Sequence, residues 1–175
     1  MFDRRLQNLT QKPLIFISKF LIKIVNPIQI TLLGFAIGIL MCLLTFFQLY
    51  LLALILLILN RLCDGLDGTM ARLTKPTPLG GYLDIVFDFI IYAGFVLAFG
   101  LSNDKNTNIS IILLFLYIGT GTTFLAKAAI QTQLEKITKT KPVEEELPKS
   151  FHYTSGLIEG SETIIFMVLC LLFPN

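Results

Sequence analysis

The sequence predicts an all-α membrane protein, a polytopic bundle of five membrane helices preceded by an amphipathic interfacial helix. Hydrophobic residues make up 54% of the 175 residues, and the mean hydropathy is +0.75. Both values are typical of membrane proteins rather than soluble domains. A helix that spans a bilayer needs about 20 apolar residues. Apolar stretches that approach this length occupy 28–47, 49–63, 82–101, 109–130 and 153–173.

The first 25 residues have a different pattern. Apolar residues recur near helical spacing from Leu14 to Val25, with Lys19 and Lys23 between them, which favours a helix lying at the membrane surface. Asn26 followed by Pro27 forms a cap and a first-turn proline, so a new helix is expected to enter the bilayer there. The chain therefore divides into a cytoplasmic interfacial segment, 1–25, and a membrane domain, 26–175.

The second apolar stretch is short, and it reaches the length of a span only if its helix continues through Asp64 and Asp67. That continuation places both acids near the membrane surface. Lysine, proline and glycine residues then interrupt the apolar pattern between Ala71 and Gly81, which predicts a tight turn between two antiparallel helices. The charged run 131–149 is expected to be a solvated loop without a catalytic role.

Basic residues indicate the orientation. They precede the first span and surround the second and fourth connections, and only Lys105 falls on the other side. By the positive-inside rule the N-terminus and both basic connections are cytoplasmic. The formal net charge is +2, too small to indicate a nucleic-acid partner, and anionic membrane lipids account for the basic bias.

Four of the twelve acidic residues belong to spans or their immediate ends. They are Asp64, Asp67, Asp84 and Asp88. Carboxylates at membrane depth are costly unless they are paired or functional. Asp64 and Asp67 are three residues apart, and Asp84 and Asp88 are four apart, so each pair shares a helix face. The turn between the helices is expected to bring the two faces together.

Four converging carboxylates need positive charge. Oxygen ligands without histidine or cysteine favour hard cations, Mg²⁺ or Mn²⁺, and four aspartates suffice to bridge two ions. Two such ions are a device for phosphoryl transfer. The glycines beside the acids, Gly68 and Gly80 among them, let a nucleotide approach the backbone, and Arg72 is able to grip phosphate oxygens in a bidentate manner.

The acids also allow two roles that involve no phosphoryl transfer. They could form salt bridges, although basic residues within the apolar cores look too few, or they could line a cation-conducting path. A transport path would distribute acids across the membrane depth, whereas all four lie toward one side. Glycines at helix contacts most often serve packing, so they indicate a substrate site here only in combination with the neighbouring acids.

These residues resemble the signature of the CDP-alcohol phosphatidyltransferases, D-x-x-D-G-x-x-A-R, seven or eight residues, then G-x-x-x-D-x-x-x-D. Every fixed position is present, with seven residues between the arginine and the next glycine. The matching residues are Asp64, Asp67, Gly68, Ala71, Arg72, Gly80, Asp84 and Asp88. Asn26, Pro27 and Thr31 resemble the start of the family's first membrane helix. The likeness is greatest to small bacterial members whose acceptor is undefined.

The resemblance implies a dimeric six-helix membrane enzyme that transfers the substituted phosphate of a CDP-alcohol to a second alcohol and releases CMP. It implies that Asp64, Asp67 and Asp84 bind two divalent cations, and that Asp88 is a further metal ligand and the base. Gly68, Ala71, Arg72 and Gly80 would line the CDP site. A bacterial inner membrane with a cytoplasmic active site is the expected location. The sequence predicts five membrane helices where the family has six, and whether the chain is truncated before a sixth helix stays open.

CDP-diacylglycerol is the donor that suits a short bacterial chain, with an alcohol as acceptor. Transfer from CDP-choline or CDP-ethanolamine to diacylglycerol is the enzymatic alternative. A cation transporter and a non-catalytic member of the family are the remaining alternatives. Arginine is absent after Arg72, which disfavours a phosphorylated alcohol as acceptor, because arginine suits bidentate phosphate binding. The identity of the acceptor stays open.

Overall fold

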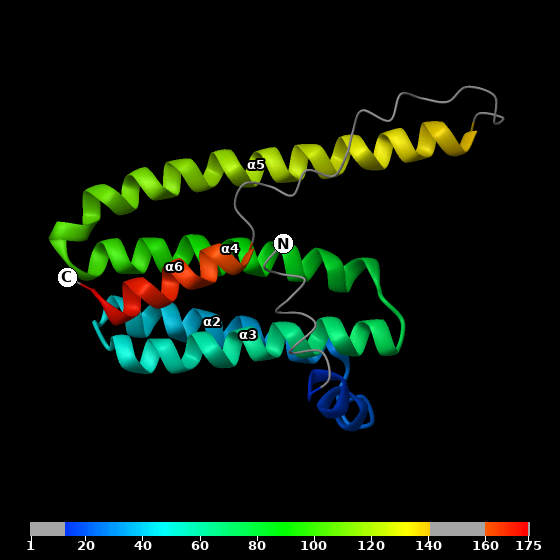
Figure 1. Cartoon of the computed structure of the whole chain (residues 1–175), viewed down its shortest axis with the longest axis horizontal. Helices are drawn as coiled ribbons and strands as arrows, with labels where there is room; N and C mark the ends of the chain where they lie inside the picture. The colour runs from blue at the N-terminus through cyan, green and yellow to red at the C-terminus, as the bar shows by residue number, and fades with distance from the viewer. Residues whose placement is uncertain (1–12, 141–159, 175) are drawn as a thin grey trace.

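The computed structural model describes residues 13–140 and 160–174, and every regular element in this part of the chain is a helix. An N-terminal helix spans residues 13–21. It is followed by α2 (Pro27–Phe46), α3 (Tyr50–Leu73), α4 (Pro78–Ser102), α5 (Asp104–Thr140) and α6 (Gly160–Leu172) (Figure 1). The predicted all-α membrane bundle is confirmed.

Local signals explain where α2 and α4 begin. α2 starts at Pro27, directly after Asn26, and the Gln29 side chain accepts a hydrogen bond from the Asn26 backbone N–H at 2.9 Å. α4 starts at Pro78, and the Thr77 hydroxyl oxygen accepts from the Gly80 backbone N–H at 3.1 Å. Proline fits the first helical turn because its missing N–H would have no partner there. The four-residue connection 74–77 is the predicted tight turn.

Within residues 13–140 and 160–174, three helices are long and apolar enough to cross a membrane: Pro27–Phe46, Pro78–Ser102 and Asp104–Ile130. α3 has 24 residues, a length of about 36 Å at 1.5 Å per residue, and it continues through Asp64 and Asp67 as predicted. α6 is described only from Gly160, so the first residues of the predicted fifth span lie outside the described part of the chain. The many exposed leucines, isoleucines and phenylalanines suit contact with lipid.

α5 is longer than predicted. The sequence pattern assigned residues from 131 onward to a solvated loop, but the helix continues to Thr140. That part of the prediction is wrong because residues 131–140 contain no proline or glycine and include several good helix formers, so polarity alone does not end the helix. The first helix-breaking residue is Pro142.

α2 is the centre of the packing. It packs closely against α3 and α4, whereas α3 and α4 approach each other less closely; α5 packs on α4 and α6 on α3. The apolar core joins four helices, and its buried members are Met41, Ala53, Leu57, Ile91, Phe95, Met167 and Leu171. The α3–α4 connection lies at one end of the bundle, and the α2–α3 and α4–α5 connections lie at the other (Figure 1). Between α3 and α4, polar contacts such as Arg61 to Asp88 occur along with aromatic ones such as Tyr50 to Phe99.

Candidate active site

Three of the four motif aspartates converge between α3 and α4. Asp64 and Asp67 project from α3 and Asp84 from α4, and each offers a carboxylate oxygen within 4.8 Å of those of the other two. Asp67 is the most enclosed, at 6% exposure, while Asp84 is exposed. Helical spacing places Asp64 and Asp67 on one face of α3, and the short turn to α4 places Asp84 opposite them. Three carboxylates this close repel one another strongly unless a cation lies between them.

Asp88 stands apart from this group. Its Oδ1 atom lies 2.8 Å from Arg61 Nη2, and its Oδ2 atom lies 3.4 Å from the Tyr92 hydroxyl, which donates to it. The geometry therefore does not gather all four aspartates around one point. Asp88 is one helical turn beyond Asp84 on the same face of α4, and its Oδ1 atom is hydrogen-bonded to a guanidinium group.

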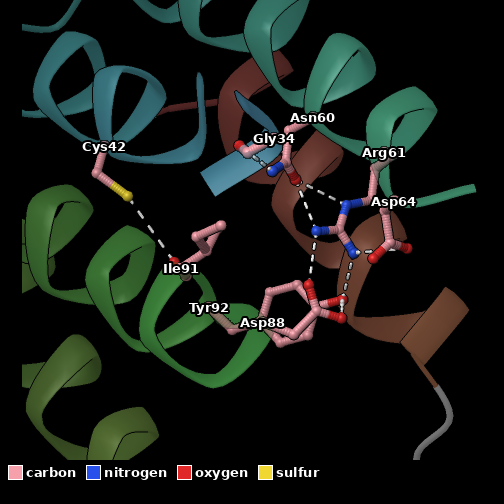
Figure 2. A network of polar contacts seen from close by, with 8 residues as sticks. All are labelled: Gly34, Cys42, Asn60, Arg61, Asp64, Asp88, Ile91 and Tyr92. Carbon is pink, nitrogen blue, oxygen red and sulfur yellow. Dashed lines mark hydrogen bonds and ion pairs between the residues drawn. The ribbon is translucent and has the colours of Figure 1, made fainter. Parts of the chain in front are cut away.

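Arg61 links the two helices through the network shown in Figure 2. Its side chain is 15% exposed. It binds Asp88, approaches Asp64 Oδ2 at 3.7 Å, and donates to the Tyr92 hydroxyl at 2.7 Å. Its Nε and Nη2 atoms both donate to Asn60 Oδ1, at 2.8 and 2.6 Å.

These ion pairs correct the interpretation that basic residues are too few to pair with the acids. The sequence pattern places Arg61 beside the basic connection, but it lies twelve residues before the end of α3 and pairs with both Asp64 and Asp88. The sequence contains a usable signal, because a charged residue three positions before Asp64 shares its helix face. Asn60 and Tyr92 are neutral, and nothing in the pattern separates them from residues that serve packing.

The converging side chains line a small cavity of about 20 Å³, which has room for little more than one water molecule. The four aspartates, Asn60 and Arg61 form its polar wall, and Thr31 and Gly34 contribute to it from α2. Phe35 and Phe87 close another side, with stacked rings whose centroids are 4.0 Å apart. The cavity is large enough for an ion, and a nucleotide would have to lie outside it.

The residues expected to line a CDP site lie at the end of the bundle beside this cavity. Gly68, Ala71 and Arg72 belong to the last turns of α3, and Gly80 to the first turn of α4. Arg72 is exposed and folds back, so that a side-chain carbon on Gly68 would lie 3.5 Å from its Nη1 atom. Its Nη2 atom donates to the Thr69 hydroxyl at 3.2 Å, and this single bond leaves several N–H donors of Arg72 available for a phosphate.

The donor set fits a divalent metal ion. Asp64, Asp67 and Asp84 supply only carboxylate oxygens, the ligands that Mg²⁺ and Mn²⁺ prefer, and their mutual distances allow one ion to contact all three. Fold and site together define a helical membrane protein with an acidic, metal-compatible centre between two antiparallel helices.

Comparison with known proteins agrees with that class. The family model for CDP-alcohol phosphatidyltransferase matches residues 24–173, and the chain belongs to this family. It is 44% identical over 154 residues to "Inner membrane protein YnjF" of Escherichia coli (strain K12), an alignment that covers 86% of this chain and 71% of that protein.

A second relative is the "Bifunctional IPC transferase and DIPP synthase" of Thermococcus kodakarensis. The two sequences are 37% identical over 81 residues, which is 46% of this chain and 18% of that protein. No solved structure matches the chain significantly.

Proposed function

We propose that this protein transfers the phosphatidyl group of CDP-diacylglycerol to an alcohol and releases CMP. The observation that carries this proposal is the convergence of Asp64, Asp67 and Asp84 to within 4.8 Å in a chain that belongs to the CDP-alcohol phosphatidyltransferase family. The pyrophosphate of a CDP-alcohol carries negative charge that a bound cation can offset. The three carboxylates are suited to hold such a cation.

Asp64, Asp67 and Asp84 would hold two divalent cations, Mg²⁺ or Mn²⁺. Bound there, the ions supply charge stabilisation for both the attacking and the leaving oxygen of a phosphoryl transfer. The protein's contribution is to fix three carboxylates on two rigid helices in advance, so that the ligand geometry does not have to be assembled when substrate arrives.

Asp88 would act as the general base that takes the proton from the acceptor hydroxyl. It lies one turn from Asp84 and shares the cavity with the proposed metal ligands, so a hydroxyl between them is within reach of a carboxylate oxygen. A metal-ligand role for Asp88 has less support, because its Oδ1 atom is engaged by Arg61.

Gly68, Ala71, Arg72 and Gly80 would line the site of the CDP moiety. Arg72 would hold phosphate oxygens with the donors that Thr69 does not occupy. The glycines carry no side chain that would obstruct a nucleotide: among the described residues, a side-chain carbon on Gly80 would meet only the Thr77 hydroxyl, at 3.1 Å, apart from the backbone of its own helix.

The proposed function also includes a location, an orientation and an oligomeric state. We place the protein in a bacterial inner membrane, as the name of the Escherichia coli relative states for that protein, with the N-terminus and the active site facing the cytoplasm. A homodimer is proposed from the family resemblance alone.

The test reconstitutes the purified protein in liposomes containing CDP-diacylglycerol and supplies Mg²⁺ or Mn²⁺ with a panel of alcohols. Mass spectrometry of the lipids is expected to show a new phosphatidyl-alcohol with one member of the panel, and CMP in equal amount. If CDP-choline or CDP-ethanolamine with diacylglycerol gives product instead, the donor assignment is wrong. If neither donor reacts, the non-catalytic alternative is favoured.

A further inference from the structure

Most of the Arg61 guanidinium's donors are used in contacts inside the protein. An arginine side chain has five N–H donors. Arg61 uses Nε toward Asn60, Nη1 toward Tyr92 and Asp64, and Nη2 toward Asn60 and Asp88. Four of the five donors are thus committed to hydrogen bonds within the protein, and Nη1 also approaches Asp64 Oδ2 at 3.7 Å, an ion-pair distance and not a hydrogen bond. Arg61 therefore differs from Arg72, which makes one hydrogen bond, and its contacts point to a role inside the protein.

Asn60 fixes the position of this guanidinium from behind. It is 2% exposed, and its Nδ2 atom donates to the Gly34 carbonyl oxygen of α2 at 2.8 Å. That bond orients the amide so that Oδ1 faces Arg61 and accepts from two of its nitrogen atoms. Gly34 permits the approach, since a side-chain carbon there would lie 3.0 Å from Cys63 Cβ on α3. Arg61 is thus anchored to α2 through Asn60 and to α4 through Tyr92.

The anchored guanidinium of Arg61 in turn holds Asp88. Its Oδ1 atom accepts the 2.8 Å bond from Arg61, whereas its Oδ2 atom has only the long, 3.4 Å contact with Tyr92. We infer that Arg61 is a positioning residue, which holds Oδ1 of Asp88 so that Oδ2 is the oxygen presented to the acceptor hydroxyl. The inference rests on the proposed role of Asp88 as base.

A simpler role would be that of a countercharge for the acidic cluster. The distances favour the positioning role, because Arg61 is hydrogen-bonded to Asp88 at 2.8 Å and only approaches Asp64, at 3.7 Å. The two roles predict different results for lysine. Lysine keeps the positive charge, but its three donors on a single nitrogen cannot reproduce a planar fork that contacts Asn60, Tyr92 and Asp88 at once.

The experiment compares Arg61→Lys with wild type in proteoliposomes, measuring CMP release and, separately, the stoichiometry of CDP binding by calorimetry. We expect kcat to fall about 10- to 100-fold, with unchanged KM for CDP-diacylglycerol, unchanged Mg²⁺ dependence and full CDP binding. Wild-type kcat would overturn the inference. A loss of CDP binding in proportion to kcat would also overturn it, because fewer folded sites would then explain the defect.

Tyr92→Phe and Tyr50→Phe form a matched pair of additional variants. Tyr92 contacts both Arg61 and Asp88, while the Tyr50 hydroxyl lies 3.2 Å from the Ser102 hydroxyl at the other end of the bundle. Tyr92→Phe is expected to lower kcat moderately and Tyr50→Phe to leave it unchanged. Equal effects of the two variants would contradict a positioning network centred on Asp88.

A double-mutant cycle tests the contact without an activity assay. It compares the unfolding temperatures, in detergent, of wild type, Arg61→Lys, Asp88→Asn and the double variant. If wild type forms no product, the proposed function fails and this cycle still tests the contact. If the double variant lowers the unfolding temperature by less than the sum of the two single-variant shifts, Arg61 and Asp88 are coupled. Additive shifts would overturn the inference, since Arg61 would then not act through Asp88.

Discussion

Arg61 Nη2 lies 2.8 Å from Asp88 Oδ1, and this pair joins two helices across 27 positions of sequence. Arg61 binds Asp88, whereas Asp64, Asp67 and Asp84 form the close carboxylate cluster. In the proposed function those three carboxylates would hold the metal ions, and Arg61 also approaches one of them, Asp64, at 3.7 Å. A partly buried pair of this kind is sensitive to the loss of one partner, because the remaining charge is left without compensation.

Replacement of Asp67 by Asn tests the proposed metal centre without measuring turnover. Asp67 is 6% exposed and lies within 4.8 Å of Asp64 and Asp84. Wild type is expected to gain about 3 kcal/mol of stability when Mn²⁺ is present at about 100 times its Kd, seen as a rise in unfolding temperature. The Asn variant should lose most of this rise, because one of three ligands is gone.

Asp104→Asn is the control for that measurement, since Asp104 is exposed in the first turn of α5, far along the chain from the cluster. It should respond to Mn²⁺ as wild type does. An equal Mn²⁺ response in wild type and Asp67→Asn would mean that the cluster does not bind the ion.

Arg72→Lys is expected to weaken donor binding more than turnover. Arg72 has available donors beside Gly68, and a bidentate grip on phosphate is lost when a guanidinium becomes an ammonium. A charge-assisted hydrogen bond contributes about 1.5 to 3 kcal/mol, so KM for CDP-diacylglycerol should rise roughly 10- to 100-fold. Lys75→Arg, in the exposed connection between α3 and α4, is the control and should leave KM unchanged.

Kinetics of CMP release at varied CDP-diacylglycerol will separate the two parameters. A fall in kcat at constant KM in Arg72→Lys would place Arg72 in the chemical step and contradict its assignment to donor binding.

Gly38→Ala tests the packing that supports the site. A side-chain carbon on Gly38 would lie 2.8 Å from Ile91 Cγ1 and 3.2 Å from Asn60 Nδ2. Ile91 is 1% exposed and has little room to move, so the variant should lose about 1 to 3 kcal/mol of stability. Unfolding in denaturant or heat measures the loss.

Gly119→Ala is the matched control, because a side-chain carbon there would meet no atom of the described residues within 4 Å apart from the nearby backbone of its own helix. Within α5 alanine favours the helix, so this variant should gain about 0.5 to 1 kcal/mol. Equal stability of the two variants would mean that α2 does not pack as closely on α3 and α4 as the structure has it.

Sequence pattern predicted the helices that build the site, because their signals are local. Pro27 and Pro78 mark helix starts, and the break between Ala71 and Gly81 marks the turn. The extension of α5 to Thr140 was missed because residues 131–140 are polar yet compatible with a helix, and polarity is a weaker signal than proline or glycine.

The arrangement of side chains within the site could be predicted only in part from the sequence. Spacing put Asp64 and Asp67 on one face and Asp84 and Asp88 on another, but spacing does not say how far two helices rotate about their axes. That rotation decides that Asp84 meets the α3 pair while Asp88 meets Arg61. Asn60 and Tyr92 gave no signal, since their roles exist only through contacts made across helices.

The most direct test of the proposed metal-dependent transfer is CMP release by wild type and Asp84→Asn in proteoliposomes, with Asp104→Asn as control. Asp84 is an exposed member of the cluster, so its replacement is not expected to impair folding. We predict release by wild type and the control that stops on chelation and returns with Mg²⁺ or Mn²⁺, and no release by Asp84→Asn. Release by Asp84→Asn at the wild-type rate, or release that survives chelation, would contradict the proposed metal centre.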